Sequence, residues 1–375
     1  MAKMNGKKLK TAILGLEGQG RLLLEAAANA DFLKIEAVAD KNSTLAQKTA
    51  AELNCTAYDD YRSLIIQNHF DWLIVAAPRH RCDKYVKDAI ERKFNILVVP
   101  PLAGNFEEAA DLVRLAEEQD IKFAVANPHR FTKGTLALQS FVTEKRIDHV
   151  FFLTAACTIG NAPLPPWRSD PKLAGGGVLM HECYDIIDLI ISCFGVPELV
   201  YSLNTSNAPD RKQRLYRTED AALLAMKFSD AFVANIVAVR AGVTEAQTKL
   251  VKICGKNKNL TLSGRDFIVT DESGKTIERL RYGGDELSAM TKLLENFALC
   301  ITSPDNNVLR SCAAENLNNM AVIEAAYLSA RTGFCEEPAR ILQMAKVEPK
   351  ITLAGPTTMK NPHLTYRPTP DNISI

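Results

Sequence analysis

The sequence lacks the features that would place the protein in a membrane, on a nucleic acid or in a disulfide framework. No uninterrupted apolar run approaches the roughly 18 residues of a membrane-spanning helix. The formal net charge is only +1, which gives no indication of a basic surface for nucleic acid or anionic lipid. The nine cysteines are odd in number and form no CxxC pair, which favours buried thiols in a reducing compartment. These absences predict a cytoplasmic protein that binds neither nucleic acid nor membranes.

The N-terminal apolar run is short, although several lysines precede it. It covers residues 11–14 and ends at a glycine, whereas the apolar core of a secretory signal has about seven to fifteen residues. We therefore expect this run to form a buried strand that enters a glycine turn.

The first third of the chain alternates short apolar runs with amphipathic segments. With 375 residues, 47% of them hydrophobic and 24% charged, the chain is long enough for two globular domains. The strand-like runs are 9–14, 35–40, 71–78, 96–99 and 121–126, and the helical segments are 21–30, 45–53, 84–92 and 106–118. This alternation predicts an α/β fold, a Rossmann-type doubly wound parallel sheet, over residues 1–127.

The pattern changes after residue 128, where strand-like runs follow one another through short, turn-like links. These runs are 150–156, 198–204, 221–228, 232–239, 249–254, 259–262, 267–270 and 276–282. Short links imply antiparallel pairing. With helical segments at 285–301 and 311–330, the pattern predicts an α+β domain over 128–335 with an open, mostly antiparallel sheet. Residues 336–375 are rich in proline and are predicted to form an extended tail.

The strongest local motif is the glycine turn at residues 15–20. Gly15, Gly18 and Gly20 follow a predicted strand and open a predicted helix, which is the context of a dinucleotide-binding turn. Asp40 ends the next predicted strand, where a carboxylate would accept ribose hydroxyls. An acid at that position favours NAD, although the neighbouring Lys41 leaves NADP open.

This turn departs from the GxGxxG pattern, because Glu17 occupies the middle glycine position. That glycine normally lets the backbone approach the pyrophosphate, and a carboxylate there adds both bulk and repulsion. Gly18 or Arg79 could compensate for the bulk and negative charge of Glu17 near the pyrophosphate. The alternative is a doubly wound domain that no longer holds a dinucleotide.

Several blocks together resemble the Gfo/Idh/MocA family, which includes glucose–fructose oxidoreductase and inositol dehydrogenase. Residues 89–103 align without a gap on the family's stretch that ends in Glu-Lys-Pro-x-Ala. Residues 167–177 match the Trp-Arg…Gly-Gly-Gly block, and 327–333 resemble the final helix of the family. Arg130-Phe131 resembles the start of its second domain, so the resemblance spans roughly residues 9–335.

The resemblance implies a substrate site between an N-terminal Rossmann domain and a C-terminal domain whose sheet often forms the oligomer interface, as in a homodimer or homotetramer. It also implies hydride transfer between a nicotinamide cofactor, NAD or NADP, and a sugar, polyol or related secondary alcohol or ketone. In the family, a lysine polarises the reacting oxygen, and an aspartate and a histidine four residues later relay the proton. By position, the resemblance assigns Gly15, Gly18, Gly20, Asp40 and Pro78 to the cofactor, and Trp167, Arg168 and Asp188 to the substrate.

The sequence departs from this pattern where the family's catalytic residues lie. Pro100 replaces the lysine, so the segment offers no proton and no charge. His181 occupies the aspartate position and Asp185 the histidine position, so the two residue types are exchanged. Cys82 also stands where many members have a histidine.

The exchanged residues still offer a workable acid–base pair. His181, Asp185 and Asp188 fall at i, i+4 and i+7, which would place them on one helical face. Asp185 would then orient His181, the predicted proton-transfer residue, with electrophilic help from Arg168, Lys172 or the nicotinamide. The alternative is a structural hydrogen-bonded pair at a helix start.

Residues 181–185 also show a partial likeness to the zinc motif HExxH. No further ligand follows in the sequence, and we expect no metal site. Cys183 is expected to be a buried thiol rather than a nucleophile, and His129 a structural or solvated histidine. The leading hypothesis is a nicotinamide-dependent oxidoreductase, and the alternative is a catalytically silent relative that serves as a binding or regulatory subunit.

Overall fold

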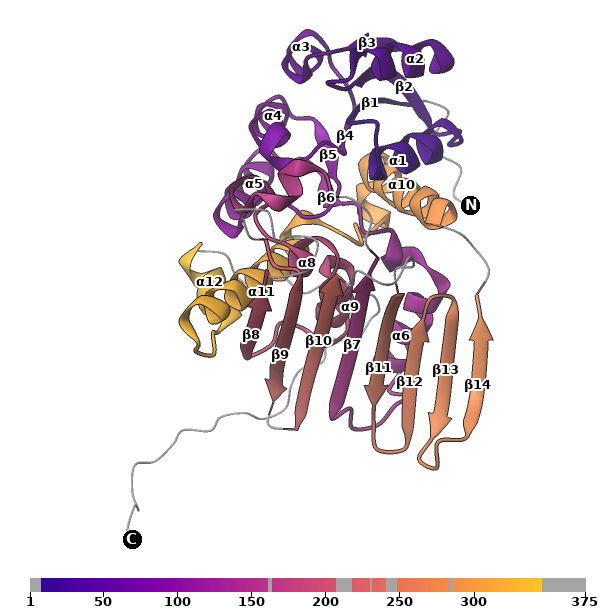
Figure 1. Ribbon diagram of the computed structural model, residues 1–375. Helices are drawn as coiled ribbons and strands as arrows, with labels where there is room; N and C mark the ends of the chain where they lie inside the picture. Colours follow the sequence, from indigo (N-terminus) through magenta and orange to yellow (C-terminus); the bar gives the residue numbers. More distant parts are fainter. Residues whose placement is uncertain are drawn as a thin grey trace.

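The computed structural model describes residues 8–160, 164–206, 218–229, 231–240, 248–282 and 286–345. Within them the chain forms two sheets, a six-stranded parallel sheet followed by an eight-stranded, mostly antiparallel one (Figure 1). The predicted fold class is therefore confirmed. None of the nine cysteines, all of which lie among the described residues, forms a disulfide. Among the described residues, no helix is long and apolar enough to cross a membrane.

The first sheet has the order β3-β2-β1-β4-β5-β6, and all of its pairs are parallel. Its strands are β1 (Leu9–Leu14), β2 (Leu33–Ala39), β3 (Thr56–Tyr58), β4 (Trp72–Val75), β5 (Asn95–Val98) and β6 (Phe123–Val125). The helices that connect them are α1 (Gln19–Ala28), α2 (Ser43–Leu53), α3 (Tyr61–Gln67), α4 (Arg79–Glu91) and α5 (Phe106–Glu118). The order reverses between β1 and β4, which is where a doubly wound sheet opens a crevice for a ligand.

Both faces of this sheet are covered, so alternate residues of a strand enter different clusters. In β1, Ala12 and Leu14 belong to the cluster on the side of α3, α4 and α5. Ile13 belongs to the cluster that contains α1 and α10 (Glu286–Thr302). Because every side chain of such a strand is buried, the run is almost continuously apolar.

Helix α10 corrects one expectation, because the segment 285–301 was assigned to the second domain. It packs against α1 on the face of the parallel sheet, and the ring of Phe297 lies 4.7 Å from that of Trp72. An apolar stripe predicts that a helix packs on something but does not specify the partner. The chain thus returns to the first domain after the second sheet is complete.

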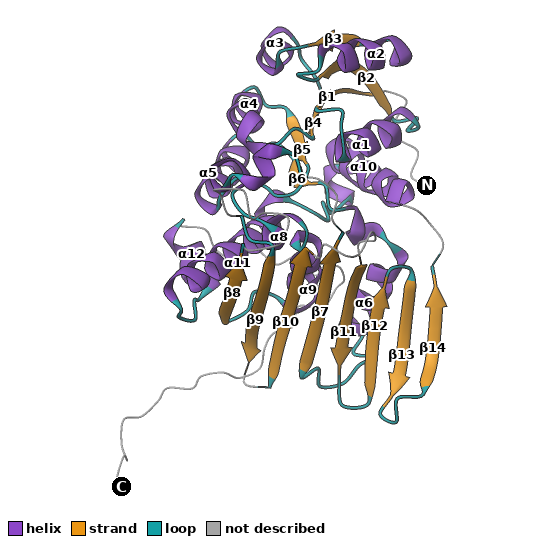
Figure 2. Cartoon of the chain, viewed as in Figure 1, coloured by secondary structure: helices purple, strands orange, loops and turns teal. Residues whose placement is uncertain are grey.

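The second sheet has the order β14-β13-β12-β11-β7-β10-β9-β8, and only β7 and β10 pair in parallel. Its strands are β7 (Phe152–Ile159), β8 (Leu199–Thr205), β9 (Ala221–Ser229), β10 (Phe232–Arg240), β11 (Thr248–Cys254), β12 (Lys258–Ser263), β13 (Asp266–Asp271) and β14 (Thr276–Arg281). One face carries α6 (Lys133–Thr143), α8 (Val178–His181), α9 (Tyr184–Phe194) and α11 (Ala313–Thr332). The other face bears no helix among the described residues (Figure 2).

The predicted tail begins later than the sequence indicated. Residues 338–344 form a further helix, α12 (Pro338–Met344), which packs on α11 and buries Ile341 and Leu342. The remainder of the predicted tail, from residue 346, lies outside the described residues.

A buried ion-pair network joins the two halves of the fold. Arg130, in the 3-10 helix η1 (Pro128–Phe131), donates from Nε and Nη2 to the two carboxylate oxygens of Asp188 in α9, over 2.7 and 2.6 Å. It also pairs with Glu315 of α11 at 2.6 Å and bonds the carbonyl of Arg310. The carboxylate of Asp188 accepts a further bond from Asn319 and is fully buried.

The same network accounts for Asp188, which was predicted to contact substrate. Burial would raise the pKa of its carboxyl, but the Arg130 guanidinium outweighs burial and holds that pKa well below its usual range. His129 lies 2.9 Å from the same carboxylate, as a structural histidine would. With its oxygens committed to protein partners, Asp188 fixes the domain junction instead of facing a ligand.

We predict that Asp188→Ala lowers the free energy of unfolding by about 3–5 kcal/mol, because it leaves the Arg130 charge buried without its main partner. Asp188→Asn should cost less, since it keeps the side-chain shape. Guanidinium unfolding followed by circular dichroism measures both effects. The control is Asp111→Ala, which breaks an exposed ion pair with Arg114 on α5. Equal midpoints for Asp188→Ala and Asp111→Ala would contradict the role given to the network.

This network also predicts a pH dependence of stability. The pKa of Asp188 is depressed in the fold, so its contribution is present above the unfolded value of about 3.9 and is lost as the pH falls through the folded value.

Candidate active site

The glycine turn has the geometry of a tight strand-to-helix connection. Gly15 has φ 86°, and its N–H donates to the carbonyl of Ala39 at 2.8 Å. A Cβ at Gly15 would lie 2.6 Å from the amide nitrogen of Ala77, and one at Gly20 would lie 2.2 Å from the carbonyl oxygen of Gly15. The glycines of a GxGxxG turn allow the tight turn, the close approach to the pyrophosphate and the close packing of helix on strand. Gly15 and Gly20 provide the first and the third of these, and Glu17 occupies the position of the second.

Asp40 is held against this turn by two backbone amides. One carboxylate oxygen accepts from the N–H of Leu16 at 2.9 Å and the other from the N–H of Asn42 at 2.8 Å. Each oxygen retains a lone pair, so the oriented carboxylate fits the two hydroxyls of a ribose. Pro78 lies between β4 and α4 and directly follows Ala77, whose backbone packs against Gly15.

Glu17 is exposed at the start of α1, which has no side-chain cap. Free amides at a helix N-terminus favour an anion such as a pyrophosphate, and the nearby carboxylate opposes that preference. Arg79 does not offset it, because its guanidinium is buried and donates to the carbonyls of Val75 and Ala77. The residues present fit a dinucleotide, with Glu17 as the one unfavourable group.

The helix is interrupted between His181 and Asp185, two residues that the sequence analysis had placed on one helical face. Helix α8 ends at His181, Cys183 caps the next helix, and α9 begins at Tyr184. The i, i+4 relation therefore does not apply, and the predicted hydrogen bond between the two side chains is replaced by two separate contacts.

His181 is a partly buried, neutral histidine. Its Nε2 lies 2.9 Å from the carbonyl of Ala174, which requires the tautomer with Nε2–H as donor. Burial, assisted by the charge of Arg168, lowers the pKa of the imidazole to about 3. Its ring lies 5.9 Å from that of Trp167, which in turn lies 5.3 Å from His80. A group with so low a pKa is a poor proton carrier near neutral pH.

Asp185 instead pairs with Lys249, a residue that sequence reasoning missed. The Nζ of Lys249 donates to both carboxylate oxygens at 2.7 and 2.6 Å. Burial alone would lower the pKa of this ammonium, but the Asp185 carboxylate outweighs burial and raises it, so Lys249 is charged. Its side chain remains 30% exposed.

Strand β11 places Lys249 on the covered face of the sheet. In the ladder Lys249 pairs with Cys157 of β7, whose side chain is buried beneath α9. Val251 and Ile253, at alternate positions, are also buried. The sequence did contain a signal for this site: Lys249 precedes Val251 and Ile253 at alternate positions of a predicted strand, which places the lysine on the face with the buried apolar side chains.

The start of α9, which carries Asp185, contacts the segment that lacks the lysine. Tyr184, next to Asp185, hydrogen-bonds the backbone of Leu102, two residues after Pro100. The sulfurs of Cys157 and Cys183 are hydrogen-bonded beneath the pair, and this bond lowers the pKa of the Cys157 thiol.

The predicted substrate residues Trp167 and Arg168 lie on a 3-10 helix, η2 (Pro166–Ser169), beside this cluster. Arg168 pairs with Glu182 at 2.6 Å. The ring of Trp167 lies between those of His80 and His181, tilted against the first and edge-on to the second. Among the described residues, no group of three or more His, Cys, Asp or Glu side chains is arranged to hold a metal.

Comparisons with known proteins agree with this architecture. Residues 9–127 match the Gfo/Idh/MocA description "Oxidoreductase family, NAD-binding Rossmann fold". Residues 141–334 match its companion, "Oxidoreductase family, C-terminal alpha/beta domain". The chain belongs to the Gfo/Idh/MocA oxidoreductase family. The predicted family and the predicted NAD-binding Rossmann domain are thereby confirmed.

Individual relatives are distant. The chain is 27% identical over 198 residues to D-xylose 1-dehydrogenase (NADP(+)) 2 of Haloferax volcanii, covering 52% of this chain and 59% of that protein. It is 23% identical over 226 residues to 2,7-anhydro-N-acetylneuraminate hydratase of Mediterraneibacter gnavus, covering 60% of this chain and 59% of that protein. The alignments thus span less than two thirds of each relative's length.

Solved structures share the fold over almost the whole chain. A levoglucosan dehydrogenase in complex with NADH and L-sorbose superposes with a TM-score of 0.79 at 18% identity, covering 89% of this chain and 100% of that one. An oxidoreductase from Agrobacterium radiobacter in complex with NAD+, L-tartaric acid and magnesium gives 0.78 at 17%, covering 90% and 100%. At these identities the likeness establishes the fold alone.

We predict that Glu17→Gly tightens NADH binding about tenfold, since it removes both bulk and negative charge beside the pyrophosphate position. Glu17→Gln keeps the bulk and removes the charge, so it separates the two effects. Titration followed by nicotinamide fluorescence gives the dissociation constants. Glu25→Gln, on an exposed face of α1, is the matched control, and unchanged affinity in both Glu17 variants would show that this side chain does not face the cofactor.

Proposed function

We propose that the protein is an NAD(P)-dependent oxidoreductase that interconverts a secondary alcohol and a ketone on a sugar or polyol. The observation that supports this most is the Lys249–Asp185 ion pair, which supplies a charged proton donor from the second domain in a chain whose Pro100 stands where the family has a lysine. The oriented carboxylate of Asp40 favours NAD over NADP, because it would repel a 2′-phosphate.

In this proposal the nicotinamide, when bound, supplies or accepts the hydride. Lys249 donates a hydrogen bond from Nζ to the reacting oxygen and exchanges a proton with it as alcohol and ketone interconvert. Asp185 holds the ammonium in place and stabilises its charge. Arg168 and Trp167 border the same region and position the substrate, while neutral His181 supports the Trp167 ring.

The sugar-like substrate rests on the names of relatives. Curated relatives include a D-xylose dehydrogenase and a 2,7-anhydro-N-acetylneuraminate hydratase, and a levoglucosan dehydrogenase shares the fold. These names support a hydroxyl-rich substrate without specifying which one.

A second candidate is a catalytically silent relative that acts as a binding or regulatory subunit. Two observations favour it: the segment at Pro100 carries no proton donor, and the imidazole of His181 is neutral. Binding of NADH without turnover of any substrate in a panel of sugars and polyols would establish that the protein is not catalytic.

We predict that Lys249→Met lowers kcat by about 10²–10⁴-fold, because it removes the proton donor, and leaves NADH affinity unchanged. His181→Gln should retain most of kcat, because the native imidazole is already uncharged. The control is Lys252→Met, which lies on the same strand, is exposed and faces away from Asp185. If Lys249→Met turns over like the wild type, the lysine role is wrong even though the oxidoreductase assignment stands.

The raised pKa of Lys249 also predicts the pH dependence. Alcohol oxidation requires the neutral amine, so its rate should rise with pH into the alkaline range, while ketone reduction uses the ammonium and is favoured near neutrality. A rate step near pH 6–7 that disappears in His181→Gln would instead assign the proton transfer to histidine.

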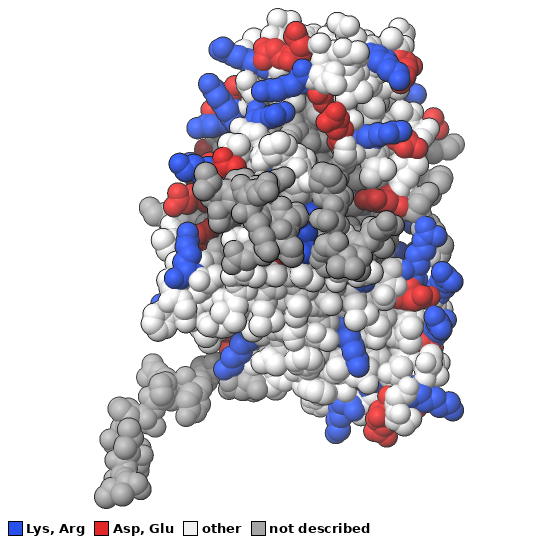
Figure 3. All heavy atoms as spheres, viewed as in Figure 1, with Lys and Arg blue, Asp and Glu red and all other residues white. Residues whose placement is uncertain are grey.

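We also propose that the open face of the second sheet forms the contact between two copies of the chain. An exposed apolar row crosses five adjacent strands in register: Leu203, Leu223, Val237, Ala156 and Leu250. Figure 3 shows few charged side chains on this face. A contiguous exposed apolar patch of this kind is typical of an association surface.

We predict that Val237→Glu converts a dimer or tetramer into a smaller species, because it places a charge at the centre of the apolar row. Sedimentation velocity measures the mass. Asn257→Glu, in the exposed turn between β11 and β12, adds the same charge away from the row. A wild-type protein that sediments as a monomer would refute the proposal.

A further inference from the structure

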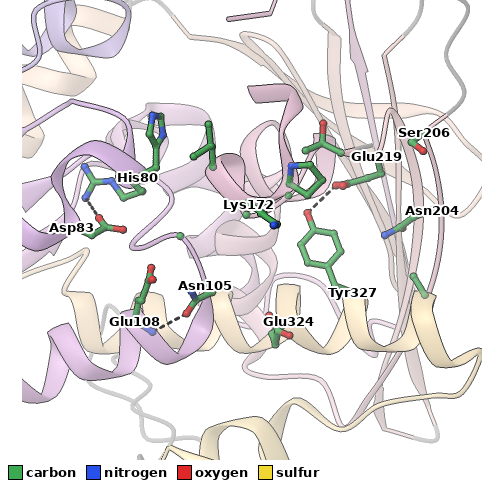
Figure 4. Close-up of a pocket in the computed structure, with 18 of the residues that line it drawn as sticks. His80, Asp83, Asn105, Glu108, Lys172, Asn204, Ser206, Glu219, Glu324 and Tyr327 are labelled. Atoms are coloured by element: carbon green, nitrogen blue, oxygen red, sulfur yellow. Dashed lines mark hydrogen bonds and ion pairs between the residues drawn. The ribbon is translucent and has the colours of Figure 1, made fainter. Parts of the chain in front are cut away.

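A large cavity lies between the two domains on the side of α4. Its volume is about 950 Å³, and its walls come from α4, the start of α5, the short helix α7 (Pro171–Ala174), the end of β8 and the C-terminal half of α11 (Figure 4). Of the described residues, neither the glycine turn and Asp40 nor the Lys249–Asp185 pair contributes to its lining. It is therefore distinct from the site described above.

The acidic side chains of this cavity are mostly committed to protein partners. Glu219 accepts bonds from the amides of Gly177 and Leu179 and from the hydroxyl of Tyr327. Glu324 pairs with Arg331 at 3.5 Å.

The basic side chains are not matched in the same way. Within the described part of the chain, the basic Arg81, Lys84 and Lys172 line the cavity without an ion pair, against two such acidic side chains, Glu108 and Glu219. The unpaired charge of the cavity is thus positive. Because opposite charges attract across a partly desolvated space, an anion is the favoured occupant.

Buried polar atoms without partners belong to residues that line one wall of the cavity. Arg79 is 5% exposed, and its Nη1 has no hydrogen-bond partner among the described residues, because Asp83 is 3.8 Å away. The Nδ1 of His80 and the Oδ1 of Asp83 are orphaned as well. Figure 4 shows the side chains of His80 and Asp83 together at one end of the cavity. A donor and acceptors left unsatisfied at one wall indicate a ligand that completes their bonds.

We propose that this cavity binds a small, hydroxyl-rich anion, a sugar phosphate or a sugar acid. The anionic group pairs with Lys84 and Lys172, which approach from α4 and α7. The hydroxyls bond the orphaned atoms at the Arg79–Asp83 wall and the amide of Asn204 opposite. Because the two lysines belong to different domains, an occupant fastens α7 to α4.

The occupant is expected to be sensed at Trp167. His80 lines the cavity, and its ring lies 5.3 Å from that of Trp167 in a tilted contact. The only other tryptophan, Trp72, is fully buried in the core of the first domain. Filling the cavity should therefore change the fluorescence of Trp167 alone.

The test is a calorimetric titration of the full chain with 6-phosphogluconate, which carries both anionic groups and several hydroxyls. We expect saturable binding that weakens with added salt and a change in tryptophan fluorescence that Trp167→Phe abolishes. Glucose 6-phosphate and gluconate then distinguish phosphate from carboxylate, with glucose and inorganic phosphate as the neutral and the hydroxyl-free probes.

The deciding variant is Lys84→Gln combined with Lys172→Gln, which should weaken binding at least about tenfold while the affinity for NADH is unchanged. The matched control is Lys87→Gln combined with Lys256→Gln, two exposed lysines outside the cavity. The proposal is overturned if no anionic probe binds the wild type, if glucose binds as tightly as the anions, or if the double variant retains full affinity. Because NADH binding is read separately, failure here leaves the oxidoreductase assignment unaffected.

Discussion

The buried ion pair between Arg130 and Asp188 is the constraint on which the arrangement of both sites depends. It joins η1, at the exit of the first domain, to α9 and, through Glu315, to α11. Two fully buried charges are costly to desolvate, and here the bidentate geometry and the added bond from Asn319 offset that cost. The start of α9 then carries Asp185 to the cleft, and the far end of α11 carries Tyr327 to the interdomain cavity.

The exchange of histidine and aspartate at positions 181 and 185 is explained by the partner that Asp185 has in the fold, the ammonium of Lys249. A family that usually brings its lysine from the first domain has here a proline at that place, and in the proposed mechanism the cation comes instead from β11 of the second domain. Asp185 is the residue that makes this possible, because without a carboxylate the partly buried ammonium of Lys249 would be destabilised. In the structure, Asp185 forms an ion pair with Lys249 and makes no pair with His181.

The sequence predicted most of the fold, because the signals involved are local. Strand-like runs located the strands of the second sheet, and the short, turn-like links between them implied that most are antiparallel. The glycine turn and Asp40 were also found, since Gly15, Gly20 and the carboxylate act within neighbouring strand ends. By contrast, the packing of α10 on the first sheet was not predicted, and His181 and Asp185 were placed on a single helix that is in fact interrupted at Cys183.

By itself, the sequence determined the two sheets, the dinucleotide turn, the family and the missing lysine, because each depends on residue type and spacing along the chain. Only the tertiary structure decided that Asp185 meets Lys249, that His181 is neutral, and that Arg81, Lys84 and Lys172 share one cavity. The physical reason is that charge pairing and desolvation act through space over a few ångströms. Lys249 and Asp185 are separated by 64 positions in the chain, and no spacing rule of a helix or strand extends that far.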